Sequence, residues 1–154
     1  MTGHRFFFLL RRFAVLVLLA LPGVLGHAQV NSEPQLKAAF LVNFLKYIEW
    51  PASSASTATI CLFGRDTLGP YLTSYEGRTI VGRELRIRRI NGPDQVAECQ
   101  ILFVPDTEDA RFGAVLRWVE NLPVLTVSDA DVFTRQGGAI ALVRADGRLQ
   151  FDIN

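Results

Sequence analysis

Three short apolar runs constrain the fold of this chain more than any other feature. Each is about as long as one strand, and unbroken apolar character is typical of strands that a parallel sheet buries on both faces. Helix signals follow the first two runs, at residues 66–75 and 108–121. Strands that alternate with helices predict βα units. The three runs are residues 59–64, 99–105 and 124–127.

The remaining segments complete an α/β fold. Residues 82–90 alternate in polarity like a strand, and residues 130–135 indicate a short helix. Residues 138–154 predict a hairpin that turns at Asp146-Gly147. We therefore expect a mostly parallel sheet with flanking helices and a C-terminal antiparallel hairpin, flavodoxin-like or Rossmann-like in outline.

Four arginines lie within the predicted strand at residues 82–90. Charged side chains protect the edge of a sheet from pairing with other chains, so the pattern favours an edge position for this strand. An anionic partner is the alternative explanation of the same charges.

The first 28 residues have the features of a secretory signal peptide. A basic start is followed by an apolar core at residues 13–21 and by small residues that predict cleavage between Ala28 and Gln29. An uncleaved membrane anchor over residues 6–25 is the alternative, but two arginines interrupt that run. We expect an exported, soluble, periplasmic protein with a single α/β domain over residues 29–154.

Removal of the leader takes both histidines, His4 and His27, out of the protein. A chain without histidine has no Ser-His-Asp triad, no Cys-His dyad and no imidazole metal site. Three of the sixteen basic residues and none of the fifteen acidic ones also leave, so the net charge becomes −2. We therefore predict no catalytic residues, no metal, no cofactor and no nucleic-acid partner.

Two cysteines, Cys61 and Cys99, remain. In an exported protein an even number of cysteines favours a disulfide over a metal site or a redox pair. Such a bond closes a loop of nearly 40 residues and stabilises the fold by about 4 kcal/mol on the chain-entropy estimate. Two buried free thiols are the alternative.

A helix begins at "SEPQ", residues 32–35, and extends to about Glu49. Ser32 and Gln35 have the spacing of a capping box, and Pro34 suits the first turn. Apolar side chains follow the helical period in two adjacent rows, which make a wider stripe than one packed face needs. The rows are Leu36, Phe40, Phe44 and Tyr47 or Ile48, and Leu41, Leu45 and Ile48.

Charged residues follow the predicted buried strands: Arg65, Asp66, Asp106 and Asp129. Ligands of open α/β sheets bind at the carboxyl ends of the strands, so these four residues form a candidate small-ligand pocket. Helix capping is the alternative role of the aspartates, because Asp is among the best N-cap residues. The stretch from Gly64 to Gly69 lacks the middle glycine of a dinucleotide-binding fingerprint.

Several segments together resemble the YfiR-like family of small periplasmic proteins, over nearly all of residues 35–154. They are "LKAAFLVNFLKYIEWP", "ICLFGRDTLG", "CQILFVP", "LPVLTVSDADVFTRQGGAIALV" and the terminal "GRLQFDIN". The resemblance implies an α/β fold, export to the periplasm and a regulatory role without catalysis. By similarity, Cys61 and Cys99 form a structural disulfide.

The resemblance also implies a partner, the periplasmic domain of an inner-membrane diguanylate cyclase. Binding represses the cyclase and thereby lowers cyclic-di-GMP and biofilm formation. Family members continue past the "F-IN" motif into a closing helical segment, whereas this chain stops at Asn154. Without that segment one face of the final strands would be uncovered; either this copy is truncated, or a partner chain fills its place.

The aromatic residues of the first helix are the candidate surface for this partner or for a homodimer, because aromatic side chains are enriched at interfaces. The alternative is that all of them belong to the core. A small-ligand sensor that uses the strand-end pocket is the alternative function. The candidate surface residues are Phe40, Phe44, Tyr47 and Trp50.

Overall fold

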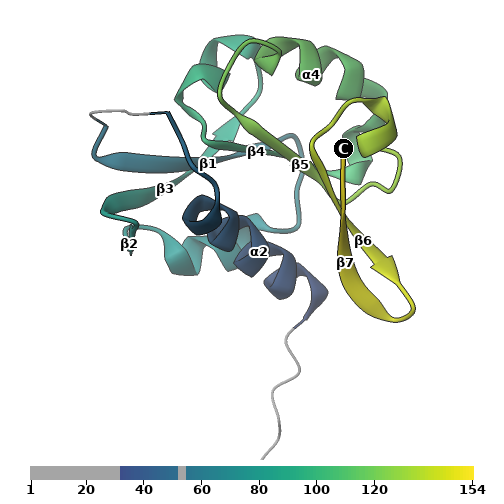
Figure 1. Cartoon of the computed structure of the whole chain (residues 1–154), viewed down its shortest axis with the longest axis horizontal. Helices are drawn as coiled ribbons and strands as arrows, with labels where there is room; N and C mark the ends of the chain where they lie inside the picture. Colours follow the sequence, from purple (N-terminus) through teal and green to yellow (C-terminus); the bar gives the residue numbers. More distant parts are fainter. Residues whose placement is uncertain (1–31, 52–54) are drawn as a thin grey trace, which may run out of the picture. The chain divides into compact units, whose positions relative to one another are not determined.

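A computed structural model describes residues 32–51 and 55–154, and its centre is a seven-stranded sheet in the order β2-β3-β1-β4-β5-β6-β7 (Figure 1). The predicted signal peptide and its cleavage site between Ala28 and Gln29 lie outside the described residues. The strands are β1 (Thr57–Phe63), β2 (Thr79–Ile80), β3 (Arg83–Ile90), β4 (Ile101–Val104), β5 (Leu125–Ser128), β6 (Ile140–Ala145) and β7 (Arg148–Ile153).

Helical segments connect these strands. α2 (Glu33–Tyr47) precedes β1, and α4 (Phe112–Val119) joins β4 to β5. Figure 1 shows α2 and α4 on opposite faces of the sheet. The shorter segments are α3 (Gly69–Leu72) and the 3-10 helices η1 (Thr73–Tyr75), η2 (Pro93–Glu98), η3 (Asp106–Arg111) and η4 (Thr134–Gln136).

The sheet separates two apolar cores. Alternate residues of β1 point to opposite faces, so Ile60 and Leu62 pack under α2, whereas Cys61 and Phe63 pack under α4. The same alternation continues in β4, whose residues are all buried. Burial on both faces explains why β1, β4 and β5 appear in the sequence as mainly apolar runs.

The predicted α/β class and the C-terminal hairpin are confirmed, but the parallel arrangement holds only for the centre of the sheet. β3, β1, β4, β5 and β6 run parallel, while β2 and β7 pair antiparallel at the two edges. Counted along the chain, the parallel strands have the order 2-1-3-4-5 of flavodoxin-like sheets. Several crossovers carry short 3-10 helices in place of full α-helices.

The hairpin turns where the sequence predicts. Asp146 and Gly147 both have positive φ, 50° and 74°, and Ala145 pairs with Arg148 across the turn. Asp and Gly tolerate this left-handed conformation, which matches the twist of the two strands.

Two predictions of local structure were wrong. Ser32 occupies the N-cap position of α2, but its side chain makes no capping hydrogen bond. Pro34 explains this in part, because it removes one of the backbone N–H donors that a capping side chain normally binds. The arginine-rich strand β3 is not the outermost strand, because the two residues of β2 lie outside it.

The arginines of β3 are instead paired within the protein. Arg86 contacts Glu84 at 3.0 Å, Arg88 pairs with Glu98, and Arg89 pairs with Asp66. Their positive charge is therefore largely balanced by neighbouring carboxylates rather than offered to an anionic partner.

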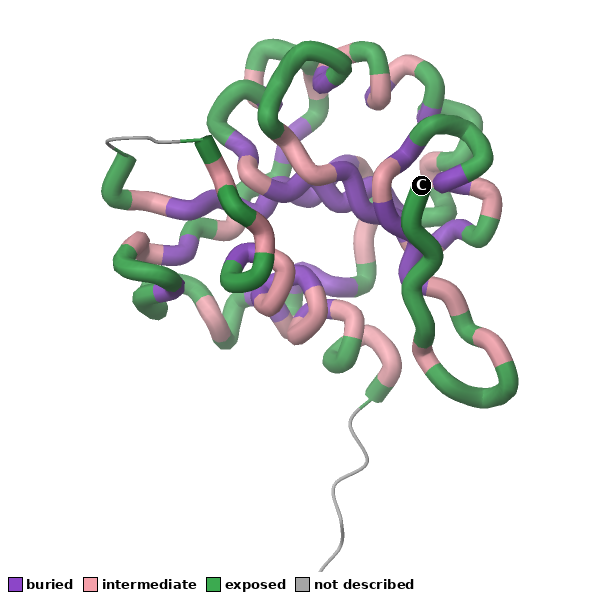
Figure 2. Tube along the Cα trace, viewed as in Figure 1, coloured by how far each residue is buried: buried purple, intermediate pink, exposed green. Residues whose placement is uncertain are grey.

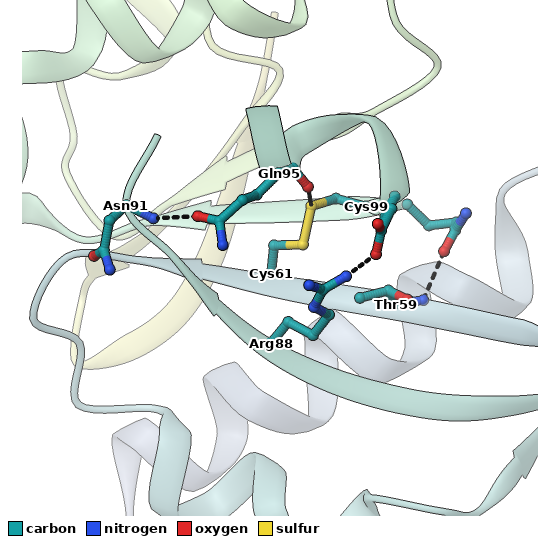
Figure 3. Close-up of a disulfide and its surroundings, with 8 residues drawn as sticks. Thr59, Cys61, Arg88, Asn91, Gln95 and Cys99 are labelled. Carbon is teal, nitrogen blue, oxygen red and sulfur yellow. Dashed lines mark hydrogen bonds and ion pairs between the residues drawn. A yellow bond between two sulfur atoms is a disulfide. The ribbon is translucent and has the colours of Figure 1, made fainter. Parts of the chain in front are cut away.

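The predicted disulfide between Cys61 and Cys99 is present and joins the middle of β1 to the residue that follows η2 (Figure 3). The Cα atoms are 5.7 Å apart, within the usual range for a disulfide, and both side chains are buried. On either side, Thr59 N–H donates to Gln100 Oε1 at 2.6 Å and Asn91 N–H donates to Gln95 Oε1 at 3.0 Å. The bond therefore fixes η2 and the start of β4 against β1.

Candidate partner surface

The first helix has one buried row and one partly exposed row of apolar side chains. Ala38, Leu41, Val42 and Leu45 are buried against the sheet. Beside them, Leu36 is 38% exposed and Tyr47 is 82% exposed. The second row is therefore exposed at its two ends and partly buried at Phe40 and Phe44 between them, which accounts for the width of the apolar stripe in the sequence.

β7 extends this exposed row. Phe151 is 48% exposed and Ile153 is 64% exposed, although both occupy the face of the sheet that α2 covers. Figure 2 shows β7 as an almost entirely exposed strand beside the buried centre of the sheet. We call the combined region the α2–β7 surface; it consists of Leu36, Phe40, Phe44, Tyr47, Phe151 and Ile153.

Three phenylalanine rings hold the two parts of this surface together. Phe151 meets Phe40 and Phe44 edge-to-face, with ring centroids 6.0 Å and 6.2 Å apart, and Phe40 lies 6.3 Å from Phe44. Aromatic pairs in this geometry contribute about 0.5–1.5 kcal/mol each beyond the area that they bury. The surface is thus ordered within the protein itself.

The four aromatic residues predicted as a partner surface have different environments. Phe40, Phe44 and Trp50 are partly buried and pack against the core, whereas Tyr47 is exposed. The Nε1 of Trp50 is a buried donor without an acceptor among the described residues. Trp50 lines a separate cleft of about 420 Å³ at the end of α2, together with Ile80 and Arg83.

A cluster of charged side chains fixes the other end of α2. Lys37 Nζ donates to Asp129 Oδ2 at 3.1 Å and lies 2.9 Å from Glu33 Oε1, and Arg144 of β6 donates to Glu33 Oε2 at 2.7 Å. The hydrogen bond from Lys37 lowers the pKa of Glu33, aided by Arg144 and opposed by partial burial. Burial acts to lower the pKa of Lys37, but its bonds to Glu33 and the charge of Asp129 outweigh this effect and raise it.

The residues of the candidate ligand pocket lie on the loops that follow β1, β4 and β5, and two of the carboxylates have partners within the protein. Asp66 Oδ1 accepts hydrogen bonds from the N–H groups of Leu68 and Gly69, at 2.8 Å and 2.5 Å, where α3 begins. Leu68 occupies the N-cap position of α3, so Asp66 binds the backbone just before this helix from two residues upstream of the cap.

The other two aspartates, Asp106 and Asp129, are joined by a hydrogen bond between backbone and side chain. Asp129 Oδ1 accepts from the backbone N–H of Asp106 at 2.9 Å, at the start of η3, while its second oxygen binds Lys37. The side chains of Arg65 and Asp106 are exposed, and Arg65 is linked to η3 through its backbone carbonyl, which accepts from Thr107. Within residues 32–51 and 55–154, no group of acidic, histidine or cysteine side chains is arranged to hold a metal ion.

Comparison with known protein families matches residues 34–154 to the YfiR/HmsC-like family. The chain belongs to this family. Its members are periplasmic regulators of cyclic-di-GMP signalling rather than enzymes. No curated protein matches the chain significantly. In the described part of this YfiR/HmsC-like protein, no helix is long and apolar enough to span a membrane.

Sequence reasoning missed two contributors to the site of this YfiR/HmsC-like protein. The hairpin prediction gives Phe151 no role in a binding surface, although Leu149, Phe151 and Ile153 alternate and so share one face of β7. Lys37 was placed on the first helix, but nothing in the sequence connects it with Asp129. Only the packing of α2 against the face of the sheet brings these two side chains together.

Proposed function

We propose that this protein is exported to the periplasm, binds the periplasmic domain of an inner-membrane diguanylate cyclase through the α2–β7 surface, and represses the cyclase. Membership of the YfiR/HmsC-like family supports the regulatory role. The observation that carries the choice of surface is the exposed row of α2, which ends in a tyrosine that is 82% exposed.

The chemistry of this surface suits a protein partner. Interface centres are rich in aromatic side chains, and a few of them supply most of the binding energy. Phe40 and Phe44 are held in place by Phe151, so their binding requires little additional ordering of side chains. Binding without turnover agrees with the absence of histidine downstream of the predicted cleavage site.

The test replaces Tyr47 with the photo-crosslinking residue p-benzoylphenylalanine in the full-length protein, expressed in its own host. Irradiation is expected to link it to an inner-membrane protein that mass spectrometry identifies as a diguanylate cyclase. The matched control carries the same residue at Leu122, which is exposed beyond α4, and should give no such product.

Cyclic-di-GMP measurements complete the test. Deletion of the gene should raise the cellular level, and wild-type protein or Leu122→Ala should restore it. Tyr47→Ala should fail to restore it, because the truncation removes an exposed aromatic anchor without disturbing the core. Unchanged cyclic-di-GMP after deletion, or full complementation by Tyr47→Ala, contradicts the proposal.

A small-ligand sensor is the second candidate. It is favoured by the position of Arg65 and Asp106, whose exposed side chains stand between β1 and β4, where the strand order of the sheet reverses. Thermal-shift measurements with divalent ions and anionic metabolites test this function. A shift that Arg65→Ala abolishes would support it.

A further inference from the structure

A cleft of about 420 Å³ lies between the end of α2 and the β2–β3 hairpin. Its apolar lining comes from three parts of the chain and includes Ile48, Trp50, Ala58 and Ile80. Sites for small molecules are mostly apolar hollows of roughly 300–1,000 Å³ that contain a few polar groups. The volume and the lining of this cleft therefore suit a small ligand.

The cleft contains the one arginine of β3 that differs from the others. Arg83 lines the cleft, is partly buried and has no ion pair within residues 32–51 and 55–154. Arg86, Arg88 and Arg89 are exposed, and each is paired with a carboxylate. A guanidinium that has lost part of its water without gaining a counter-ion favours the binding of an anion.

The other charged residues of the cleft indicate which anion fits. Lys46 and Glu49 also line it, and both are exposed. Two cations and one anion leave a net charge of +1 around the cleft, which matches a ligand with a single negative charge. A carboxylate carries that charge and can accept two parallel hydrogen bonds from the guanidinium of Arg83.

Two features of the cleft are unfavourable in the protein on its own. Trp50 Nε1 is a buried donor without an acceptor. Val81, at the tip of the β2–β3 hairpin, has a positive φ of 48° and is 71% exposed. A β-branched residue rarely adopts this conformation, and unsatisfied or strained groups of this kind are concentrated at binding sites. The exposed valine also gives the rim of the cleft an apolar side chain that a ligand can cover.

We propose that this cleft binds a small monocarboxylate with an aliphatic chain. Its carboxylate binds Arg83, and its chain packs against Ile48, Ile80 and Val81. The carboxyl end of a peptide has the same chemistry, and the proposal commits to the free acid. The cleft shares no residue with the α2–β7 surface, and binding needs no cyclase, so this inference does not rest on the proposed function.

Isothermal titration calorimetry of protein purified from the periplasm tests the proposal, with octanoate as the probe. Binding is expected to saturate, and the affinity should rise about fourfold for each methylene from butyrate to hexanoate to octanoate. Octylamine, which has the same chain length and a positive charge, should not bind. A peptide with an apolar C-terminal residue is the second probe; binding of this peptide without binding of octanoate overturns the proposal.

Three variants test the assigned contacts. Arg83→Met should weaken octanoate binding by at least about tenfold, because it removes the charged donor and keeps a side chain of similar length. Glu49→Gln should strengthen binding about twofold to threefold, because it removes a like charge from the cleft. Arg86→Met is the matched control on the same strand; side chains three residues apart in a strand point to opposite faces, so this variant should bind like wild type. Circular dichroism checks that each variant is folded.

Tryptophan fluorescence provides a second readout. Trp118 packs edge-to-face on Phe63 under α4, on the other face of the sheet, so Trp118→Phe leaves Trp50 as the only reporter in the described part of the chain. Octanoate should change its emission with the dissociation constant that calorimetry gives. Octanoate binding that Arg83→Met does not weaken, equal binding of octylamine, or no saturation below about 10 mM overturns the proposal.

Discussion

Lys37 on α2 and Asp129 at the end of β5 form a hydrogen-bonded ion pair of 3.1 Å across a sequence separation of 92 residues. Each side chain is only 11% exposed. Asp129 in turn binds the backbone N–H of Asp106, so one carboxylate connects the first helix with the loops after β4 and β5. The pair therefore determines how α2, and the aromatic row that it carries, is positioned on the sheet.

Removal of the charge of Lys37 should lower the stability of the fold. Lys37→Met leaves Asp129 as a largely buried carboxylate without its counter-ion, so the free energy of unfolding should fall by about 2–3 kcal/mol. Urea denaturation of wild type and variant measures this change. Lys46→Met is the matched control, because Lys46 lies on the same helix but is exposed and, among the described residues, bonds only Asn43; it should change stability by less than about 0.5 kcal/mol. Equal losses in the two variants would contradict the assigned role of the ion pair.

The pH dependence of stability should report the state of Glu33. Its folded-state pKa lies below the ordinary value of 4.5, so its contribution to stability is complete above that value and is lost as the pH falls through the lower folded pKa. The pKa of Lys37 is raised above 10.5, so Lys37 stays charged over the whole acidic range. Between about pH 6 and pH 3, wild type should lose more unfolding free energy than Glu33→Gln. Parallel stability curves for the two proteins would show that Glu33 has no such linkage.

Reduction should weaken the fold through Cys61 and Cys99. The disulfide closes a loop with a sequence separation of 38, which corresponds to about 4 kcal/mol of stabilisation on the chain-entropy estimate. Urea denaturation with and without dithiothreitol should show a loss of this size for wild type. The double variant Cys61→Ala/Cys99→Ala should be insensitive to the reductant. If wild type unfolds at the same urea concentration in both conditions, the bond is not a structural one.

Asp66 is expected to stabilise the start of α3. Asp66→Ala removes two hydrogen bonds to backbone N–H groups and the ion pair with Arg89, and should cost about 1–2 kcal/mol. Asp131→Ala is a suitable control, because this aspartate is exposed on the loop after β5. Thermal unfolding of both variants provides the comparison, and an equal midpoint for the two would argue against this role.

The parts of the fold that were predictable are those in which local sequence and final environment agree. β1, β4 and β5 are buried on both faces and are therefore mainly apolar, and the hairpin turn has the Asp-Gly pair that its positive φ angles favour. β2 was missed because two residues are too few to show a period. Because β2 lies outside β3, β3 is the second strand of the sheet and not the edge strand that the sequence predicts.

The candidate site was predictable only in part, because its composition depends on tertiary contacts. The aromatic row of α2 follows from helical spacing, but the sequence does not reveal which rings another element covers. Phe40 and Phe44 meet Phe151 from the far end of the chain, whereas Tyr47 meets no ring of the described residues. Likewise, the sequence alone does not show that Asp129, a predicted pocket residue, binds Lys37 of the first helix.

The unequal length of the two outermost strands limits how large an assembly this sheet can build. Of the two sheet edges that the described residues form, β7 is the longer, and the other edge is the two-residue strand β2, which provides too little backbone to continue the ladder. Association in the plane of the sheet is therefore self-terminating. Concentrated protein is therefore not expected to polymerise into fibres by strand addition at both edges of the sheet.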